Sequence, residues 1–260
     1  MTASAATATW RPSAATWTSA WTSSGSGCAR RPTPNCSPPC AASRARSHVS
    51  PPEWTLTKSI VLVPHGAGNI ASLVELFHAI GRFPKVAESP AQLHGADLAV
   101  VPGVGASGSA MRRLHETGFA DALLSMHARE HRILGICVGA QIMFDDLHED
   151  NCKGLALLPG NVSRLAGGAF HNGWSGISAV TASPGSKPAL LKTAEKNFYF
   201  NHGYQINTDA PMDERGITRG EHALLAYFLH GHLCGIQFHP EKSQAVGVAF
   251  IDNVMKHYGL

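Results

Sequence analysis

Hydrophobic positions between Lys58 and about residue 148 follow two alternating patterns. Continuous hydrophobic runs predict strands buried on both faces of a sheet, and helical spacing after each run predicts helices. The strands are expected at residues 59–63, 97–101 and 132–136, and the helices at 70–80, 109–131 and 139–148. Repeated strand–helix units predict an α/β fold with a doubly wound, mostly parallel sheet and right-handed crossovers.

After residue 154 the pattern changes to short strand-like runs. They predict an added region of antiparallel strands at residues 161–165, 176–180, 197–201, 224–229 and 233–238. Helical spacing returns at residues 242–257 and predicts a last helix. No internal repeat is present.

Residues 1–57 have a different composition from the rest of the chain. They hold five Arg, no Lys, one acidic residue, four of the five Trp and three of the six Cys. Neither helical nor alternating periodicity occurs there, so a disordered low-complexity extension is expected, followed by one domain at residues 58–260. A misassigned start of the reading frame, a targeting segment and an interaction tail are the three interpretations of the extension. The protein is expected in the cytoplasm, or in an organelle if the extension is a transit peptide.

Charge and composition exclude several classes of function. Removing the five Arg and one Glu of residues 1–57 leaves 16 basic and 17 acidic residues, so no basic nucleic-acid surface is predicted. No hydrophobic run reaches the roughly 18 residues that a membrane helix needs. The cysteines form neither a disulfide framework nor a zinc ribbon, and His127 and His131 lack further ligands in a metal-binding pattern. We therefore expect no metal and no cofactor.

Cys137 lies between a predicted strand and a predicted helix, flanked at two residues' distance by Gly135 and Gly139. Glycines at these positions permit a sharp turn in which backbone packs against backbone. A helix N-terminus favours the thiolate form of a cysteine, and the N–H group of Val138 can point at an oxyanion. The pattern predicts a nucleophilic cysteine.

His239 is the best candidate for the base that this nucleophile needs. Pro240 keeps His239 extended at the carboxyl end of a predicted strand, the same end of the sheet as Cys137. Glu241 can accept a hydrogen bond from the other ring nitrogen. Taken singly, the residues fit a core cysteine, a strand-end histidine and a surface glutamate; together they favour a catalytic triad of Cys137, His239 and Glu241.

These residues resemble the class I glutamine amidotransferases. The resemblance rests on Gly-Ile-Cys-Val-Gly at residues 135–139 with Gln141, and on Gln-Phe-His-Pro-Glu-Lys-Ser at residues 237–243. Further segments resemble the glutaminase subunits of imidazole glycerol phosphate synthases in histidine biosynthesis, at residues 66–69, 102–105, 154–160, 173–174 and 198–204. The resemblance covers residue 58 to the C-terminus and none of the extension.

The resemblance implies a glutaminase that hydrolyses glutamine to glutamate and ammonia. It implies that Gly103, Val104 and Gly105 contribute to the oxyanion hole with Val138; a strand-ending turn is the alternative for that segment. Gln141 and Gly139 would bind glutamine, and Asn69, Trp174 and Tyr204 would face the partner. That partner is a (β/α)8 barrel cyclase that receives the ammonia in a heterodimer, and it is expected to be a separate chain because the amidotransferase fold accounts for residues 58–260.

Three segments depart from the family pattern. The family usually has Asp-Tyr where this chain has Pro64-His65, Met-Gly-Trp-Asn where it has Asn-Gly-Trp-Ser at residues 172–175, and Ser or Thr in place of Gly203. Since these segments are expected near the partner, an amidotransferase that supplies ammonia to another synthase is an alternative. A non-catalytic partner subunit and a solitary hydrolase of γ-glutamyl substrates are two others.

Overall fold

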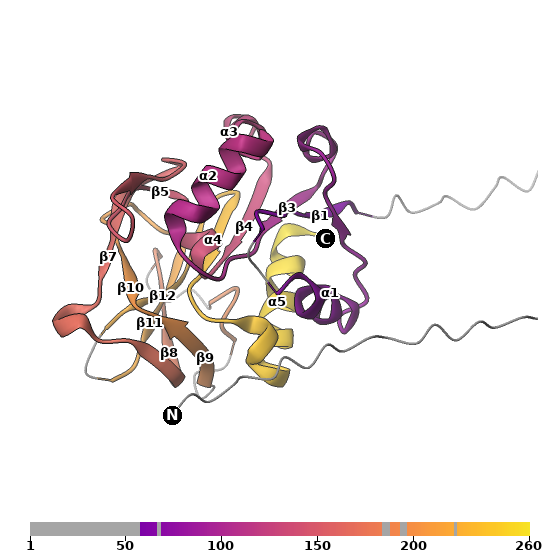
Figure 1. The fold of residues 1–260 in the computed structure, drawn as a ribbon. Coiled ribbons are helices and arrows are strands. Elements are labelled where there is room, and N and C mark those ends of the chain that lie inside the picture. The colour runs from indigo at the N-terminus through magenta and orange to yellow at the C-terminus, as the bar shows by residue number, and fades with distance from the viewer. Residues whose placement is uncertain (1–57, 67–68, 184–187, 193–196, 221–222) are drawn as a thin grey trace, which may run out of the picture. The chain divides into compact units, whose positions relative to one another are not determined.

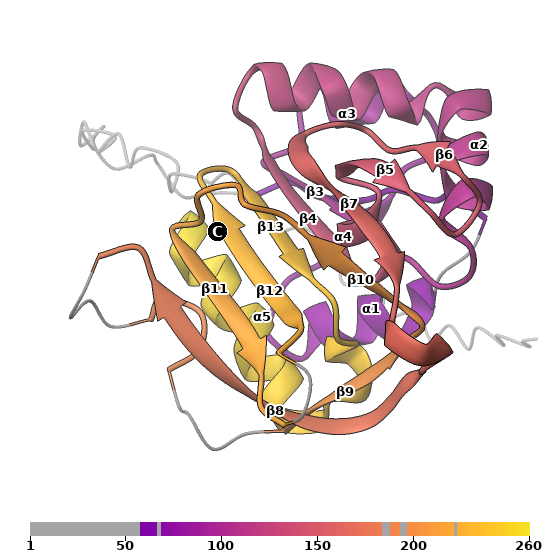
Figure 2. The ribbon, with the colours of Figure 1, turned by 90° about the vertical axis from the view of Figure 1, so that its left-hand side faces the viewer.

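A nine-stranded sheet runs through the part of the chain that the computed structural model describes, residues 58–66, 69–183, 188–192, 197–220 and 223–260 (Figures 1 and 2). The strand order is β2-β1-β3-β4-β13-β12-β11-β8-β9. In that order the strands are β2 (Lys85–Val86), β1 (Ile60–Leu62), β3 (Leu98–Val101), β4 (Arg132–Ile136), β13 (Leu233–Ile236), β12 (Leu225–His230), β11 (Glu214–Thr218), β8 (His171–Thr181) and β9 (Asn197–His202). Neighbours are parallel from β2 to β13 and antiparallel from β13 to β9.

Helices cover both faces of the parallel strands, as Figure 1 shows. Leu62, Val100 and Ile136 point to the face that packs against α1 (Ile70–His78) and α5 (Gln244–Tyr258). Val61, Val101 and Ile133 point to the other face, which packs against α2 (Ser107–Thr117) and α3 (Phe119–Ala128). The predicted doubly wound α/β fold, with its added antiparallel strands, is confirmed.

A second sheet extends the core on the α2 and α3 side (Figure 2). Its strand order is β10-β7-β5-β6, formed by β10 (Tyr204–Asn207), β7 (Leu158–Arg164), β5 (Phe144–Leu147) and β6 (Cys152–Lys153). Phe144 is fully buried, and its ring meets that of Phe228 edge to face at 5.5 Å, which joins the two sheets. Burial of such a side chain contributes about 1.5–3 kcal/mol.

The predicted helix at residues 139–148 is wrong. Only α4 (Val138–Gln141) is helical, and β5 begins at Phe144. The carbonyls of Ile142 and Met143 accept hydrogen bonds from Leu155 and Leu157, so the returning chain replaces the bonds that a longer helix would form. Hydrophobic residues in this stretch are buried in either conformation, which is why their pattern did not separate the two.

The predicted helix at residues 109–131 is two helices. Gly118, with φ of 77°, ends α2 and leads directly into α3. Left-handed backbone is readily adopted by glycine and ends many helices. The short strands β2, β5, β6, β10 and β11 were not predicted from the hydrophobic pattern. The expectation for residues 1–57 lies outside the described residues.

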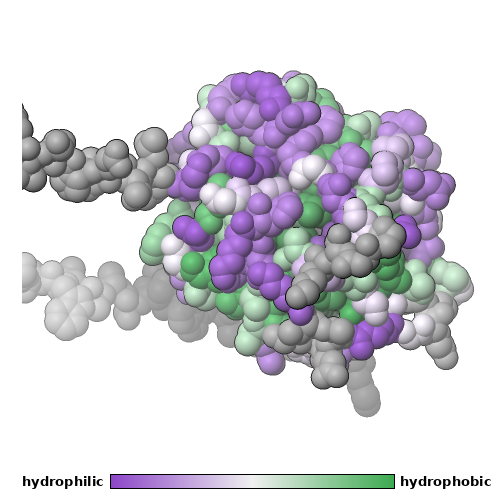
Figure 3. Space-filling model, turned by 180° about the vertical axis from the view of Figure 1, so that it is seen from behind, coloured by the Kyte–Doolittle hydropathy of each residue, from purple (hydrophilic) through white to green (hydrophobic). Residues whose placement is uncertain are grey.

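The surface of the described chain mixes polar and hydrophobic residues. In Figure 3, hydrophilic residues cover most of the upper part of the face opposite to that in Figure 1, and hydrophobic residues lie scattered among polar ones below. Among the described residues, no helix is long and apolar enough to cross a membrane.

Candidate active site

Cys137 occupies a sharp turn between β4 and α4. Its φ of 54° and ψ of −110° lie in a region that L-residues rarely adopt, at a cost of order 1–3 kcal/mol. Its N–H donates to the carbonyl of Ile236 at 2.6 Å, which fixes the turn to β13. The glycines on both sides of the turn have no room for a side chain. A Cβ on Gly139 would collide with the Val101 carbonyl, and one on Gly135 would collide with the Gly139 backbone. The two glycines therefore make the elbow possible.

His239 lies three residues beyond β13, the strand that pairs with β4. Its Nδ1 donates to Glu241 Oε1 at 2.9 Å, and both side chains are buried. Ser243 holds the turn, because its hydroxyl donates to the His239 carbonyl at 2.7 Å and accepts from the Tyr199 N–H at 3.0 Å. The remaining ring nitrogen, Nε2, is thus left to face Cys137.

Opposing effects set the pKa of His239. Burial lowers it, but hydrogen bonds to Cys137 and Glu241 and the negative charges of both groups raise it to about 9. At neutral pH the ring is therefore an imidazolium between a carboxylate and the sulfur. This state has a proton to give away and favours a nucleophilic thiolate.

The two groups open into a cavity of about 500 Å³. Of the predicted site residues, it brings together Val104, Gly105, Cys137, Val138, Gln141, Tyr204 and His239. It is also lined by residues that were not predicted as site residues: Ala106, Glu149, Arg164, Ala169, Phe170, Asn201, His202 and Gly203.

Other predicted residues lie outside the cavity. Gly103 packs against Val138 and Gly139, and Gly139 packs against Val101 and Pro102, so crowding accounts for both glycines. The expectation that Gly139 contacts substrate therefore has no support in the structure.

Two of the three expected partner-facing residues are exposed. The side chain of Asn69 accepts from the Ser72 N–H at the start of α1. Trp174 is 47% exposed and leans on Tyr199. Tyr204, the third, forms part of the cavity wall.

Two buried amide side chains, Gln141 and Gln237, form a chain of hydrogen bonds that ends at the Cys137 sulfur. Gln141 Nε2 donates to the Tyr204 carbonyl at 3.2 Å and to Gln237 Oε1 at 3.1 Å. Gln237 Nε2 in turn donates to Cys137 Sγ at 3.8 Å. Gln237 was not selected as a site residue, although its place two residues before His239 puts it on the same face of the chain. With its N–H groups engaged, Gln141 has its carbonyl oxygen left for a substrate.

His202 is a second histidine in the cavity, and its pKa is shifted in the opposite direction to that of His239. Its Nδ1 donates to the Tyr204 carbonyl at 2.7 Å, so Nε2 accepts from His171 Nδ1 at 3.2 Å, and His171 Nε2 accepts from the Ser175 hydroxyl at 2.8 Å. Burial, followed by the nearby charges of His171 and His239, lowers its pKa to about 4 despite the carbonyl bond. His202 therefore stays neutral beside the His239 imidazolium.

Glu149 brings a carboxylate into the cavity. Its Oε2 accepts from the Ser107 N–H at 2.8 Å, and Asp150 accepts from Gly108, so both acids cap the start of α2. This arrangement orients Glu149 and leaves Oε1 available. No sequence signal selects it, because residues 148–150 are far from α2 along the chain and connect β5 and β6 of the second sheet.

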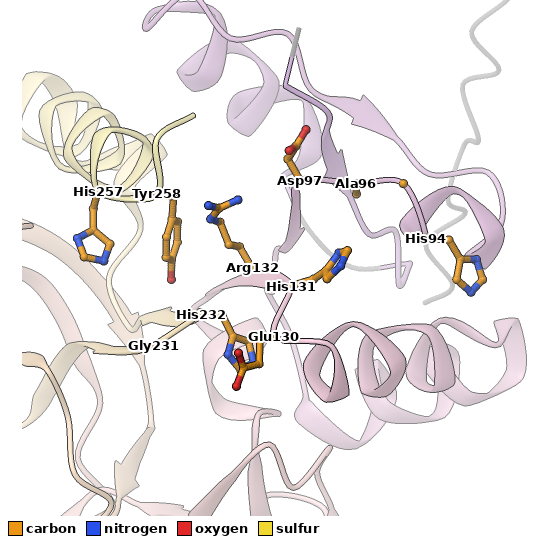
Figure 4. Close-up of a pocket in the computed structure, with 11 residues that line it drawn as sticks. His94, Ala96, Asp97, Glu130, His131, Arg132, Gly231, His232, His257 and Tyr258 are labelled. Carbon is orange, nitrogen blue, oxygen red and sulfur yellow. The ribbon is translucent and has the colours of Figure 1, made fainter. Parts of the chain in front are cut away.

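A separate cavity of about 470 Å³ lies at the amino ends of β3, β4 and β13, the edge of the sheet away from Cys137. His94, His131, His232, His257 and Arg132 line it. Figure 4 shows His94 and His257 at opposite sides of this cavity, so the four imidazoles do not converge on one point. Among the described residues, no group of three or more His, Cys, Asp or Glu is placed to hold a metal ion.

The chain is similar in sequence and in fold to known proteins. A family model described as glutamine amidotransferase class-I matches residues 67–256. A Halalkalibacterium halodurans protein named imidazole glycerol phosphate synthase subunit HisH is 33% identical over 201 residues, 74% of this chain and 92% of that protein. The chloroplastic imidazole glycerol phosphate synthase hisHF of Arabidopsis thaliana is 33% identical over 200 residues, 74% of this chain and 33% of that protein. A crystal structure of a glutamine amidotransferase shares the fold, with a TM-score of 0.60 and 17% identity over 77% of this chain and 99% of that one.

Proposed function

The chain belongs to the class I glutamine amidotransferase family, and from this we propose that it is the glutaminase subunit of an imidazole glycerol phosphate synthase. It hydrolyses glutamine to glutamate and ammonia, and the ammonia passes to a cyclase subunit. The observation that carries the glutaminase activity is that Cys137 and His239 line one cavity and that the His239 imidazole is hydrogen-bonded to both Cys137 and Glu241.

Acylation begins when the Cys137 thiolate attacks the carboxamide carbon of glutamine. A carbon–sulfur bond forms, and the amide oxygen takes up the negative charge. Val138 is the first residue of α4, so its N–H has no partner within the helix and can donate to this oxyanion. Val104 and Gly105, with φ of 93° at Gly105, line the same cavity and are proposed to supply the second donor through the turn that begins at Gly103.

Ammonia departs when the carbon–nitrogen bond breaks and the His239 imidazolium gives its proton to the leaving nitrogen. The neutral His239 then takes a proton from a water molecule that attacks the thioester. Breaking of the carbon–sulfur bond releases glutamate and restores the thiolate–imidazolium pair. Glu241 holds the ring in one tautomer throughout by accepting from Nδ1.

Groups around the cavity suit the rest of the substrate. The free oxygen of Gln141 is proposed to accept from glutamine, and the free Oε1 of Glu149 is proposed to pair with the α-ammonium group. No redox group or metal is required for these steps, because the cysteine, the histidine and water balance the reaction.

The proposed partner is a (β/α)8 barrel cyclase in a separate chain. The names of the HisH relatives support a synthase subunit, and the Arabidopsis hisHF protein contains a long part beyond the matched third. Asn69, Trp174 and Tyr204 are proposed to face the cyclase. An exposed Trp174 supports this role, since aromatic side chains are enriched in protein interfaces.

Glutaminase activity should be measured with and without a barrel cyclase of histidine biosynthesis. We expect hydrolysis of glutamine that the cyclase stimulates, and loss of all hydrolysis in Cys137→Ala with the complex still formed. Cys234→Ala is the matched control, because Cys234 is buried on β13 outside the cavity. Activity that survives Cys137→Ala rules out the mechanism, and a cyclase without any effect rules out the proposed partner.

A further inference from the structure

Only a few titratable groups line the cavity of Cys137. His239 is hydrogen-bonded to Cys137 and Glu241, and the Nδ1–H of His202 donates to the Tyr204 carbonyl. Glu149 and Arg164 remain, and no ion pair joins them among the described residues. The cavity therefore offers one free carboxylate oxygen and one guanidinium besides its catalytic pair.

Arg164 is placed by the second sheet. It is the last residue of β7 and pairs with Tyr204, the first residue of β10. Directly opposite residues of an antiparallel pair project on the same side, with Cβ atoms about 4.5–5.5 Å apart. The carbonyl of Tyr204 accepts from Gln141, so Arg164 stands beside the residues that approach the substrate.

The guanidinium of Arg164 has no acceptor in the described part of the chain. No hydrogen bond or ion pair is formed by its N–H groups, in contrast to Arg82, Arg113, Arg129 and Arg219. Glycines lie beside it in the following turn, where a Cβ on Gly168 would come within 3.9 Å of Arg164 Nε. These glycines carry no side chain that could cover the guanidinium.

Glutamine presents two charges at the end remote from its carboxamide. Glu149 is matched to the α-ammonium group, which leaves the α-carboxylate without a counterion in the cavity. An arginine fork binds a carboxylate through two parallel N–H···O bonds, a geometry that lysine does not reproduce.

We propose that Arg164 binds the α-carboxylate of glutamine and makes the cavity specific for free glutamine over γ-carboxamides that lack this charge. The inference rests on the proposed glutaminase activity and names a specificity-determining residue for it. Arg164 does not touch the reacting atoms, so its loss weakens binding and leaves the chemical step intact.

The test compares L-glutamine with L-glutaminamide, in which a neutral amide replaces the α-carboxylate. Affinity is measured by calorimetry on the full-length Cys137→Ser protein, where turnover does not interfere, and KM and kcat are measured on the protein with its cysteine. Arg164→Gln should weaken L-glutamine binding by about 10- to 100-fold, the range for hydrogen bonds to charged groups. Its kcat should stay within about threefold, and its preference over glutaminamide should disappear. Arg129→Gln, a control on the far end of α3, should change nothing.

Each outcome is decisive. Arg164→Lys should retain part of the preference, since a point charge remains without the fork. Equal loss of affinity for both ligands in Arg164→Gln, or no loss, overturns the role of Arg164 while glutamine hydrolysis by the unsubstituted protein leaves the proposed function standing. Absence of that hydrolysis in the presence of the cyclase overturns the proposed function itself, and the role of Arg164 with it.

Discussion

Two histidines line one cavity, and at neutral pH His239 is positively charged whereas His202 is neutral. His239 is surrounded by a carboxylate and a sulfur that stabilise its cation, and its pKa is raised to about 9. His202 donates to a carbonyl and faces His171 and His239, and its pKa is lowered to about 4. Environment alone separates their roles, because the free side chains titrate alike.

Glu241→Gln should narrow the pH range of activity from the alkaline side. The amide side chain of the new residue can still accept a hydrogen bond from His239 Nδ1. The substitution removes the negative charge that stabilises the His239 imidazolium. We expect the alkaline limb of kcat/KM, near pH 9 in the unsubstituted protein, to move down by about one unit. A profile from pH 6 to 10 measures this, and an unmoved limb would show that Glu241 does not stabilise the cation.

Neutral His202 links folding stability to pH. Its folded pKa of about 4 lies below the unfolded value of 6.5, so the unfolded state binds more protons between these values and stability rises with pH there. The shift corresponds to about 3 kcal/mol at most, present above pH 6.5 and lost as the pH falls to 4.

His202→Gln should make the free energy of unfolding less dependent on pH in that window, because glutamine stays neutral. Urea denaturation at pH 7, 5.5 and 4.5 measures the dependence. The control is His94→Gln, an exposed histidine that should leave the slope unchanged. An unaltered slope in His202→Gln would contradict the assignment of a neutral, buried His202.

The triad was predictable from sequence, whereas most of the cavity wall was not. Cys137 and His239 follow strands whose neighbourhood in a parallel sheet is implied by the strand–helix alternation, and Glu241 lies two residues away along the chain. Glu149 and Arg164 reach the cavity through the second sheet, in which β7 and β10 join residues 40 to 46 positions apart, and His202 ends β9 at the edge of the nine-stranded sheet. Short polar strands carry little hydrophobic pattern from which such pairing can be inferred.

At the scale of elements, close packing between β3 and α4 fixes the position of the nucleophile. Gly139 touches the Val101 carbonyl so closely that a methyl group cannot enter without moving one backbone from the other. The short α4 also limits how much the helix dipole can contribute, because one turn aligns few peptide groups. Hydrogen bonds from Gln237 and the neighbouring imidazolium are the more direct influences on Cys137.

Gly139→Ala should therefore destabilise the protein by about 3 kcal/mol or more and abolish glutaminase activity, as overpacking against a rigid backbone does. Gly81→Ala is the control: its φ is 71°, but no atom lies within 4 Å of the added methyl group. It should cost only about 1 kcal/mol and keep full activity. Urea denaturation and glutaminase assays measure both effects, and equal costs for the two variants would show that crowding at Gly139 is unimportant.

At the scale of the whole molecule, the first strand is tied into the sheet within two residues of the proposed domain boundary. Ser59 N–H donates to Asp97 at 2.8 Å, and Lys58 forms an ion pair with the same carboxylate at 3.3 Å. This exposed ion pair is worth less than about 1 kcal/mol. The larger contribution comes from β1, which lies between β2 and β3 and whose residues are all buried.

We therefore predict that a chain of residues 58–260 keeps the stability and activity of the full protein. Its melting temperature should agree within about 2 °C, since the strand that joins the core is complete and a loss of 1 kcal/mol corresponds to about 2–4 °C at this size. A chain of residues 64–260 is the control, because it lacks β1 and leaves β2 without the only strand it pairs with in the described sheet. Without β1, the edge of β3 would be unpaired, and we expect this shorter chain not to fold.

Thermal unfolding and glutaminase assays with the cyclase compare the three proteins. A fall of more than about 5 °C in the 58–260 chain would contradict the boundary at residue 57, because it would assign more than 1 kcal/mol of stability to residues 1–57.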